Sequence, residues 1–484
     1  MTLRSCETGR RARLALFATA LVAAAAIAPA APETALPDRI GDYVRGFLQR
    51  HAVPSAAVSV VKDGAVVFAA GYGAANLEWK IPADEKTLYE IGSISKQFTA
   101  EAVLMLVEEG TLGLDDPIGR WLPSVPAAWS KITVRHLLTH TSGLYDWDGA
   151  PDFSYRREYT PAEYVGILAA HPLAFEPGER PVYTNGGFPL LGLIVEAVSG
   201  RPFEAFVAER IFKPARMAST RFKHPEEIVE RRAAGYLDNN GTLQNGEPLR
   251  PAIIAPNGGI MSSAADLANW SIALGNGALV KPATLDLMTA PLRLNDGTPY
   301  DAGMAWFLDT YRGRRLLLHN GSTTAGFSSV VYRYPAERLA VSALMNLDRW
   351  NAVNVLATRV AAFFVRGLSN AELAEMPDPD PTAGTRFLAL LADIAEGRPA
   401  DLLAPSLKRA SGEPALPRDW GFRGTPDRFA AIDKEDLGAE GVLRFGQRIR
   451  WICRYRLTAG SRVVDYTFEL KSDGKVARMF PEIE

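Results

Sequence analysis

The strongest candidate for chemistry in this sequence is a serine followed three positions later by a lysine. Ser93 and Lys96 belong to the run Gly-Ser-Ile-Ser-Lys, directly before an apolar-periodic segment at residues 97–109. On a helix, residues three apart share a face, so the lysine amine can reach the serine hydroxyl. Serine is a weak nucleophile at its ordinary pKa, and a lysine activates it only if desolvation or a nearby cation keeps the amine neutral. The pair therefore predicts a nucleophile beside a possible base.

The same Ser-x-x-Lys pattern recurs elsewhere in the chain, among other places at Ser472 and Lys475. There the intervening Asp473-Gly474 lies between two strand-like runs, which predicts a hairpin turn. A match to this pattern can therefore be a coincidence, and residues elsewhere in the chain must distinguish Ser93 from Ser472.

A second motif, Tyr183-Thr184-Asn185, is the only Tyr-x-Asn in the chain and lies in a turn-rich stretch. If Lys96 and another cation lowered the pKa of Tyr183, its phenol could carry the proton between Ser93 and a leaving group. Asn185 could donate a hydrogen bond to a substrate carbonyl. A core tyrosine and a turn asparagine are the alternative interpretation.

A third motif, His319-Asn320-Gly321, ends an apolar strand-like run and is the only His-x-Gly in the chain. A strand beside the nucleophile would supply the backbone N–H of Ser322, which together with the N–H of Ser93 would form an oxyanion hole. His319 would add a proton donor or a positive charge, or else be a hydrogen-bonded structural histidine.

The order Ser-x-x-Lys, Tyr-x-Asn, His-x-Gly resembles the penicillin-recognising serine hydrolases of the class C β-lactamase type. This group includes penicillin-binding proteins, D-alanyl-D-alanine carboxypeptidases, D-aminopeptidases and β-lactamase-like esterases. The resemblance extends from about Leu36 to Arg366 and includes the flanking segments 134–144, 175–180 and 258–267.

The resemblance implies a role for each motif residue. Ser93 would be the acylated nucleophile, and Lys96 and Tyr183 the base system. The implied substrate-binding residues are Asn185, Asn320 and Gly321, and Ser322, which completes the oxyanion hole.

The sequence differs from class C β-lactamases at the third motif. Those enzymes are similar to each other in having Lys-Thr-Gly where this chain has His319-Asn320-Gly321. In those enzymes the positive charge of this lysine adds to the electrostatic field that acts on the tyrosine of the second motif. The threonine helps to hold the carboxylate of the substrate. Arg314 and Arg315 could compensate, or could be exposed charges at a strand edge. We therefore expect peptidase or esterase activity in preference to efficient β-lactam hydrolysis.

The succession of elements predicts an α/β (α+β) fold, in which an antiparallel sheet of the β-lactamase/transpeptidase type is flanked by helices. Helix-rich residues 113–290 interrupt the strands and predict an inserted all-α lobe. Expected helices are 35–51, 97–109, 115–121, 134–138, 161–170, 190–198, 266–274 and 354–366; expected strands are 56–61, 65–70, 316–318, 327–332 and 339–344.

A proline-rich run at residues 376–381 marks a change in composition. We predict a serine hydrolase domain at 31–370, a linker at 371–385, and a small α+β accessory domain at 386–484. That last domain would open with a helix at 387–396 and end in four strands from Gly441 onward.

The first 30 residues have the pattern of an export signal. Four arginines precede an apolar run at residues 14–27, and Ala28-Pro29-Ala30 follows as a small-x-small cleavage pattern. The run is shorter than the roughly 20 residues of a membrane-spanning helix, and no later segment could span a membrane. We expect a periplasmic or secreted protein cleaved near Ala30; an uncleaved N-terminal anchor is the alternative.

The composition and net charge of the chain limit the classes of function that it could have. The chain has 484 residues, 47% hydrophobic and 22% charged, with a net charge of −2, which gives no reason to expect a nucleic-acid partner.

After cleavage Cys453 would be the sole cysteine, so no internal disulfide is possible, and its alternating apolar surroundings predict a buried thiol. His136 and His140 have a spacing that could bind zinc, but no His-Glu-x-x-His arrangement accompanies them. We expect no metal and no cofactor.

These observations predict an exported serine hydrolase that forms an acyl-enzyme on Ser93 with a small-molecule or peptide substrate, a cell-wall peptide among the candidates. The alternative is a non-catalytic penicillin-binding or cell-wall sensor protein. The oligomeric state stays open.

Overall fold

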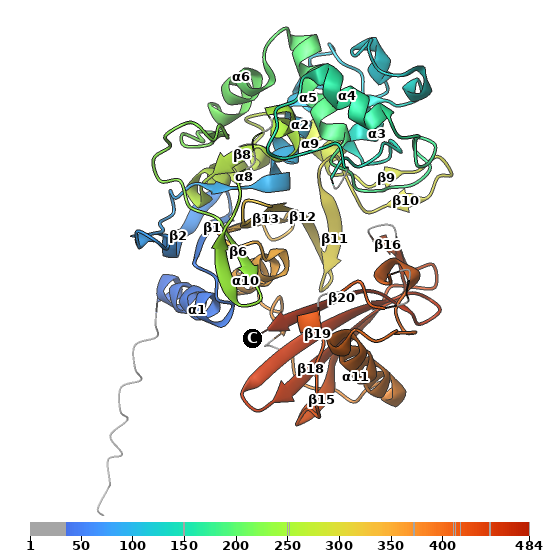
Figure 1. The fold of residues 1–484 in the computed structure, drawn as a ribbon. Helices are drawn as coiled ribbons and strands as arrows, with labels where there is room; N and C mark the ends of the chain where they lie inside the picture. Colours follow the sequence, from blue (N-terminus) through green and yellow to red (C-terminus); the bar gives the residue numbers. More distant parts are fainter. Residues whose placement is uncertain are drawn as a thin grey trace, which may run out of the picture.

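A seven-stranded antiparallel sheet forms the centre of the computed structural model (Figure 1). Its strand order is β11-β12-β13-β14-β1-β2-β3, so the first strands of the chain pair with strands from residues 307–345. The mixed fold predicted from the sequence, an antiparallel sheet flanked by helices, is confirmed. The strands are β1 (Ser55–Lys62), β2 (Ala65–Asn76), β3 (Ile81–Pro82), β11 (Phe307–Tyr311), β12 (Arg314–Thr323), β13 (Phe327–Tyr334) and β14 (Leu339–Met345).

The structure describes residues 35–148, 151–248, 250, 252–370, 373–409, 411, 413–416, 418–444 and 447–483. The predicted export signal lies outside the described residues. None of the helices within these ranges is long and apolar enough to cross a bilayer.

The two faces of the sheet carry separate hydrophobic cores because side chains alternate along each strand. In β12, Leu317 belongs to the core beneath the helical lobe, whereas Leu316 and Leu318 belong to the core on the opposite face. That opposite face is covered by α1 (Leu36–Arg50) and α10 (Trp350–Ala362). Both helices were predicted, although α10 begins four residues earlier than expected.

The helical lobe between β3 and β11 surrounds α2 (Ser95–Glu108), whose first three turns are buried throughout. The predicted all-α character is only partly correct, because short strands interrupt the lobe: β4 (Tyr89–Glu90) and β5 (Arg221–Phe222) pair with β8 (Ile260–Ser262). The helix expected at 115–121 is a single 3₁₀ turn at Ile118–Arg120. The other lobe helices are α3 (Val134–Leu138), α4 (Pro161–Ala169), α5 (Gly187–Ser199), α6 (Phe203–Val207), α7 (Ala255–Gly258), α8 (Ala264–Gly275) and α9 (Pro282–Met288).

The C-terminal region, described from residue 373 to 483, has its own four-stranded sheet and its own hydrophobic core. Helix α11 (Pro381–Glu396) packs on this sheet, where the rings of Phe387 and Phe468 stack with centroids 4.2 Å apart. The helix begins six residues before the expected position, inside the predicted linker, because Asp380 caps it and Pro381 suits its first turn. The strands are β15 (Arg428–Asp436), β18 (Trp451–Ala459), β19 (Arg462–Leu470) and β20 (Val476–Ile483), beside a hairpin of β16 (Val442–Arg444) and β17 (Gln447–Ile449).

Two predictions in this region can be checked directly. The Ser-x-x-Lys match at Ser472 lies in the turn between β19 and β20, where Gly474 has a φ of +77° and its N–H donates to the Lys471 carbonyl. Cys453 is buried, and burial raises the pKa of its thiol to about 11. Both expectations are confirmed, whereas the boundaries proposed for the domains stay a prediction.

Gly321 of β12 sets how closely the sheet approaches the turn that precedes α2. A Cβ at this position would overlap the carbonyl oxygen of Ile91 and the Ser329 hydroxyl, which donates to that carbonyl at 2.8 Å. We therefore expect Gly321→Ala to lower the free energy of unfolding by about 1–3 kcal/mol. The matched substitution Gly166→Ala, on α4 with nothing within 4 Å of a new Cβ, should leave it unchanged or slightly raised. Equal urea midpoints for both variants would contradict this packing argument.

Candidate active site

Ser93 lies in a single 3₁₀ turn, Gly92–Ile94, that joins the lobe to the buried helix α2. The N–H of the preceding Ile91 donates to the Ile260 carbonyl at 3.0 Å, and the Ile91 carbonyl accepts from Ser329 of β13. Gly92 has a φ of +50°, a conformation that favours glycine. The turn is therefore held from both sides, and α2 begins at Ser95, so the serine stands just before the helix and not within it.

Lys96 lies at the centre of a hydrogen-bond cluster. Its Nζ donates to Ser93 Oγ at 3.0 Å, to Asn185 Oδ1 at 2.9 Å and to the Asn257 carbonyl at 3.2 Å. Asn257 Nδ2 also donates to Asn185 Oδ1 at 3.2 Å. The structure thus brings the predicted Ser93, Lys96 and Asn185 into direct contact.

The Lys96 side chain is fully buried, and burial lowers the pKa of its amine to about 7, although Asp146 and Asp148 act in the opposite direction. The aromatic rings of Tyr183 and Phe188 lie 5.0 and 5.6 Å from Nζ. Near neutral pH a substantial fraction of the amine is therefore uncharged and able to accept a proton.

Tyr183 forms one wall of the site. The residue as a whole is 38% exposed, while its ring packs on His140 with centroids 4.3 Å apart. The condition of a lowered pKa is not met for this phenol: desolvation of the hydroxyl group raises its pKa, and the hydrogen bond with Ser93 offsets this only in part. The phenol is therefore protonated at neutral pH and suited to donate a proton rather than to accept one.

His319 faces the same site from β12, with its ring 6.2 Å from that of Tyr183 and 5.1 Å from that of Phe307. Burial, helped by the charge of Lys96, lowers its pKa to about 3, so of the roles that the sequence left open, a positive charge is not supported. Nδ1 donates to the Asn320 carbonyl at 2.7 Å, which leaves Nε2 as an acceptor. His319 is thus an uncharged residue at the position where class C β-lactamases have the lysine of Lys-Thr-Gly.

The residues after His319 divide between the two faces of the sheet. The Asn320 side chain points away from Ser93 and donates to Asn354 Oδ1 of α10 at 2.6 Å. The structure therefore does not bring this predicted substrate-binding side chain into the site. Ser322 does lie beside it: a Cβ built on Gly92 would be 2.8 Å from the Ser322 backbone nitrogen.

The two arginines before the strand motif make contacts elsewhere. Arg314 donates to the Arg366 carbonyl at 3.0 Å and pairs with Glu337, and Arg315 donates to the Thr289 carbonyl at 2.7 Å. Neither replaces the missing lysine of the motif.

Two residues of the site were not predicted. Asp146 Oδ1 accepts from the Asn185 N–H at 3.2 Å, and burial raises the pKa of this carboxyl group. Asn257 comes from α7, about 160 residues after Lys96, and has no local sequence signal. His140, which the sequence offered only as half of a zinc-like spacing, has Nδ1 accepting from the Thr184 N–H at 3.3 Å, so it supports the loop that carries Tyr183.

The zinc interpretation of His136 and His140 has no support in the geometry. His136 Nδ1 accepts from the Thr133 N–H at 3.2 Å and so caps α3. Within the described ranges, no cluster of three or more His, Cys, Asp or Glu side chains could hold a metal ion.

Comparison with known proteins identifies the family. A model of the family described as Beta-lactamase matches residues 40–365, which is more than half of the chain. The chain belongs to the β-lactamase family. It is 31% identical over 308 residues to penicillin-binding protein 4* of Bacillus subtilis (strain 168), covering 60% of this chain and 68% of that protein. It is also 28% identical over 319 residues to protein flp of Staphylococcus aureus (strain MW2), covering 64% of this chain and 63% of flp, so it spans less than two thirds of that relative.

Two solved structures resemble this β-lactamase-family protein. A D-stereospecific amidohydrolase from Streptomyces sp. has a TM-score of 0.58 and 28% identity, covering 68% of this chain and 98% of the other. An octameric penicillin-binding protein homologue from Pyrococcus abyssi has a TM-score of 0.59 and covers 92% of this chain and 99% of the other; at 24% identity it shows the fold alone. Together with the family match, the amidohydrolase supports assignment as a serine hydrolase.

The lowered pKa of Lys96 predicts the pH dependence of Ser93 reactivity. Because the amine loses its proton as the pH rises through about 7, the rate of Ser93 labelling by a fluorophosphonate should rise about tenfold per unit below pH 7 and level off above it. Intact-mass spectrometry over time at each pH measures this rate. A rate that keeps rising up to pH 10, as for a solvated lysine, would contradict the assignment.

Proposed function

We propose that this protein is an exported serine hydrolase that forms an acyl-enzyme on Ser93. The observation that carries the proposal is the contact of Ser93 Oγ with the buried amine of Lys96, at 3.0 Å. A lysine can act as a base only when it is uncharged, and burial supplies that condition. Export is proposed from the N-terminal sequence pattern.

In the proposed acylation step, Lys96 Nζ accepts the Ser93 proton while Oγ attacks the substrate carbonyl carbon. The oxyanion that forms would accept from the backbone N–H groups of Ser93 and Ser322. Tyr183 keeps its own proton because burial raises its pKa, so it would donate that proton to the leaving group and recover one from Lys96. Water would then attack the ester, with the same groups moving protons in reverse.

Asn185 would position the substrate. Its Oδ1 accepts from Lys96 and from Asn257, and its backbone N–H donates to Asp146. With the amide oxygen occupied, Nδ2 is the group available to donate to a carbonyl of the substrate. The two contacts to Oδ1 would hold the amide in this orientation.

The charge of the site favours amide or ester substrates without a carboxylate near the scissile bond. His319 is neutral, and Arg314 and Arg315 contact other parts of the chain. We therefore propose peptides containing D-amino acids, including cell-wall peptides cleaved away from their C-terminal carboxylate, or carboxylic esters as substrates in preference to β-lactams. The likeness to a D-stereospecific amidohydrolase supports the peptide class.

Labelling of the two serines tests the proposed nucleophile. A fluorophosphonate should modify the wild-type chain once, at Ser93, and Ser93→Ala should abolish both the label and turnover of every ester and D-amino-acid peptide substrate. Ser472→Ala, the matched control from another Ser-x-x-Lys sequence, should keep both, because Ser472 lies in a turn. Full turnover by Ser93→Ala would contradict the mechanism. A stable adduct at Ser93 with no turnover would instead favour a penicillin-binding or sensor protein.

The proposed effect of the missing charge at the third motif can be tested by introducing the residues of the class C β-lactamase pattern one at a time. His319→Lys places a cation on the site face of β12, so acylation by benzylpenicillin, measured by mass spectrometry, should become about tenfold faster or more. Asn320→Thr should give no such gain, because that side chain lies on the other face. A gain from Asn320→Thr, or none from His319→Lys, would contradict the explanation from charge.

A further inference from the structure

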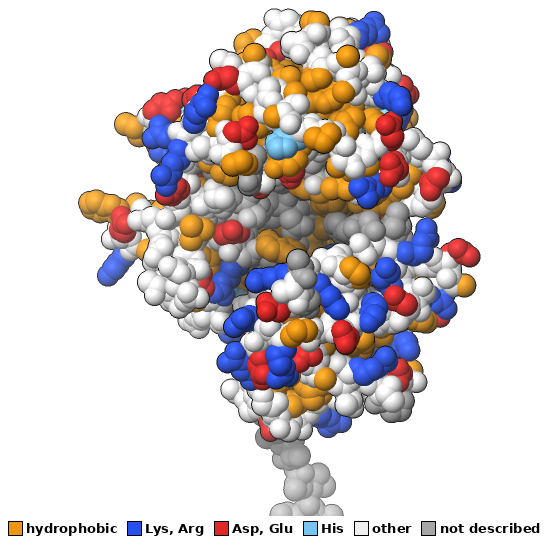
Figure 2. Space-filling view, turned by 45° about the vertical axis from the view of Figure 1, so that its right-hand side comes forward, with side chains coloured by type: hydrophobic (Ala, Val, Ile, Leu, Met, Phe, Trp, Pro, Cys, Tyr) orange, Lys and Arg blue, Asp and Glu red, His pale blue; other side chains and the backbone are white. Residues whose placement is uncertain are grey.

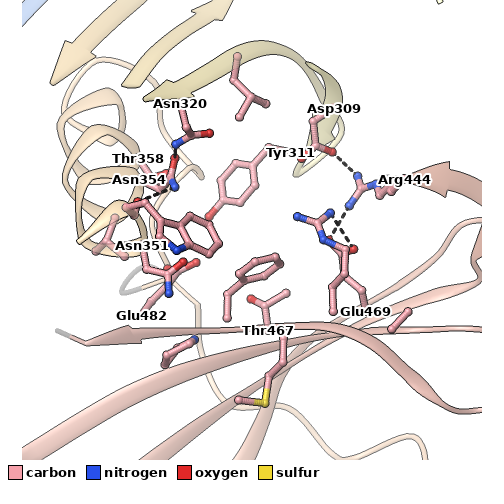
Figure 3. A pocket seen from close by; sticks show the side chains of 18 of the residues that line it. Asp309, Tyr311, Asn320, Asn351, Asn354, Thr358, Arg444, Thr467, Glu469 and Glu482 are labelled. Atoms are coloured by element: carbon pink, nitrogen blue, oxygen red, sulfur yellow. Dashed lines mark hydrogen bonds and ion pairs between the residues drawn. The ribbon is translucent and has the colours of Figure 1, made fainter. Parts of the chain in front are cut away.

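A cavity of about 520 Å³ lies between the central sheet and the C-terminal region (Figure 3). It is on the face of β12 opposite Ser93: Leu316, Leu318 and Asn320 form part of its lining, whereas His319 points to the other side. Helix α10 forms one wall and β18–β20 another. Figure 2 shows the surface hollowed where the C-terminal region meets the rest of the molecule. The proposed acylation mechanism does not use this cavity.

Aromatic side chains from both parts of the chain form the apolar wall of the cavity. Trp350 comes from α10, Trp420 from the 3₁₀ turn Arg418–Trp420, and Phe480 from β20. Ring centroids are 6.3 Å apart for Trp350 and Trp420, and 6.5 Å for Trp420 and Phe480. Flat aromatic surfaces of this kind favour the ring of an aromatic or alicyclic molecule.

Four charged side chains of the cavity form ion pairs with one another. Arg444 pairs with Asp309 of β11 and with Glu469 of β19, the latter at 3.1 Å, and Arg478 pairs with Glu469 at 3.1 Å. Arg444 also donates to the Thr310 carbonyl at 2.9 Å, so this row of charges joins the C-terminal region to the edge strand of the sheet. A charged ligand would have to disturb these buried pairs, which is costly.

One polar group is presented to the cavity in a fixed orientation. Asn354 Oδ1 accepts both from Asn320 Nδ2 at 2.6 Å and from Tyr332 Oη at 2.8 Å, and Asn354 Nδ2 donates to the Trp350 carbonyl at 2.8 Å. These contacts fix the amide of Asn320, whose side chain reaches from the strand toward the cavity in Figure 3. Its Oδ1 is thereby an acceptor for a ligand N–H or O–H.

We propose that this cavity is a binding site for an uncharged small molecule with an aromatic or alicyclic body and one N–H or O–H donor. Its volume is in the usual range for small-molecule sites, most of the surface of its walls is apolar, and the polar side chains described above are held in place by their contacts. The ligand would contact both the central sheet and the C-terminal region. The site is separate from Ser93, so this inference does not depend on the proposed function.

The full-length Ser93→Ala protein, titrated with the uncharged fluorophore N-phenyl-1-naphthylamine, tests the proposal. We expect saturable binding with one site per chain. The anionic analogue 1-anilinonaphthalene-8-sulfonate, which has the same ring system with an added sulfonate, should bind at least about tenfold more weakly. Absence of saturable binding, or equal affinity for both probes, would overturn the proposal.

Variants locate the binding site of the probe. Asn351→Trp, whose side chain lines the cavity, and Trp420→Ala, which removes part of the aromatic wall, should each weaken binding about tenfold or more. Trp79→Ala, the matched control at a side chain that is 79% exposed and absent from the cavity lining, should not. Circular dichroism checks that each variant is folded, and Trp420→Ala provides a second test if Asn351→Trp does not fold.

The probe must also be distinguished from an occupant of the active site. Wild-type protein labelled at Ser93 with a fluorophosphonate should bind N-phenyl-1-naphthylamine with unchanged affinity. Displacement of the probe by the label, or unchanged binding in both cavity variants, would show that the probe lies elsewhere and would overturn the proposal.

Discussion

The account of this protein depends on one buried amine. Lys96 is fully enclosed by the helical lobe, and its pKa of about 7 means that folding disfavours its charged form by about 5 kcal/mol relative to a solvated lysine. Such a cost is tolerated only where packing around the group is extensive. Here α2 is buried on all sides in its first turns, and Asn185, Asn257 and Ser93 satisfy the amine. The same burial that destabilises the charge makes the amine a base.

Strand β12 is the second constraint, because its two faces belong to different sites. His319 faces Tyr183, and the backbone of Gly321 and Ser322 lies against the turn that holds Ser93. Asn320 faces α10 and the cavity shared with the C-terminal region. A single strand thus connects the acylation site to the region where the C-terminal part of the chain docks. This alternation follows from the period of two in any strand.

Much of the framework could be predicted from local sequence patterns. Helix α1, strands β1 and β2, the strands after residue 313 and the turn that contains Ser472 all have strong local signals, and the structure has each of them. The start of α11 was missed because a proline-rich run suggests a linker, although Asp380-Pro381 is also a good helix start. Asn257 and Asp146 could not be found, because they meet Lys96 and Asn185 only through the fold.

Charge states were the least predictable property. Whether Tyr183 and His319 are charged depends on how the completed fold encloses them, and motif order contains no such information. Heteronuclear NMR can measure the protonation of Lys96 directly, as the shift of its ¹³Cε and ¹⁵Nζ signals with pH, assigned by their loss in Lys96→Met. The account predicts a midpoint near pH 7. An amine that stays protonated above pH 9 would contradict the claim that burial makes Lys96 the base for Ser93.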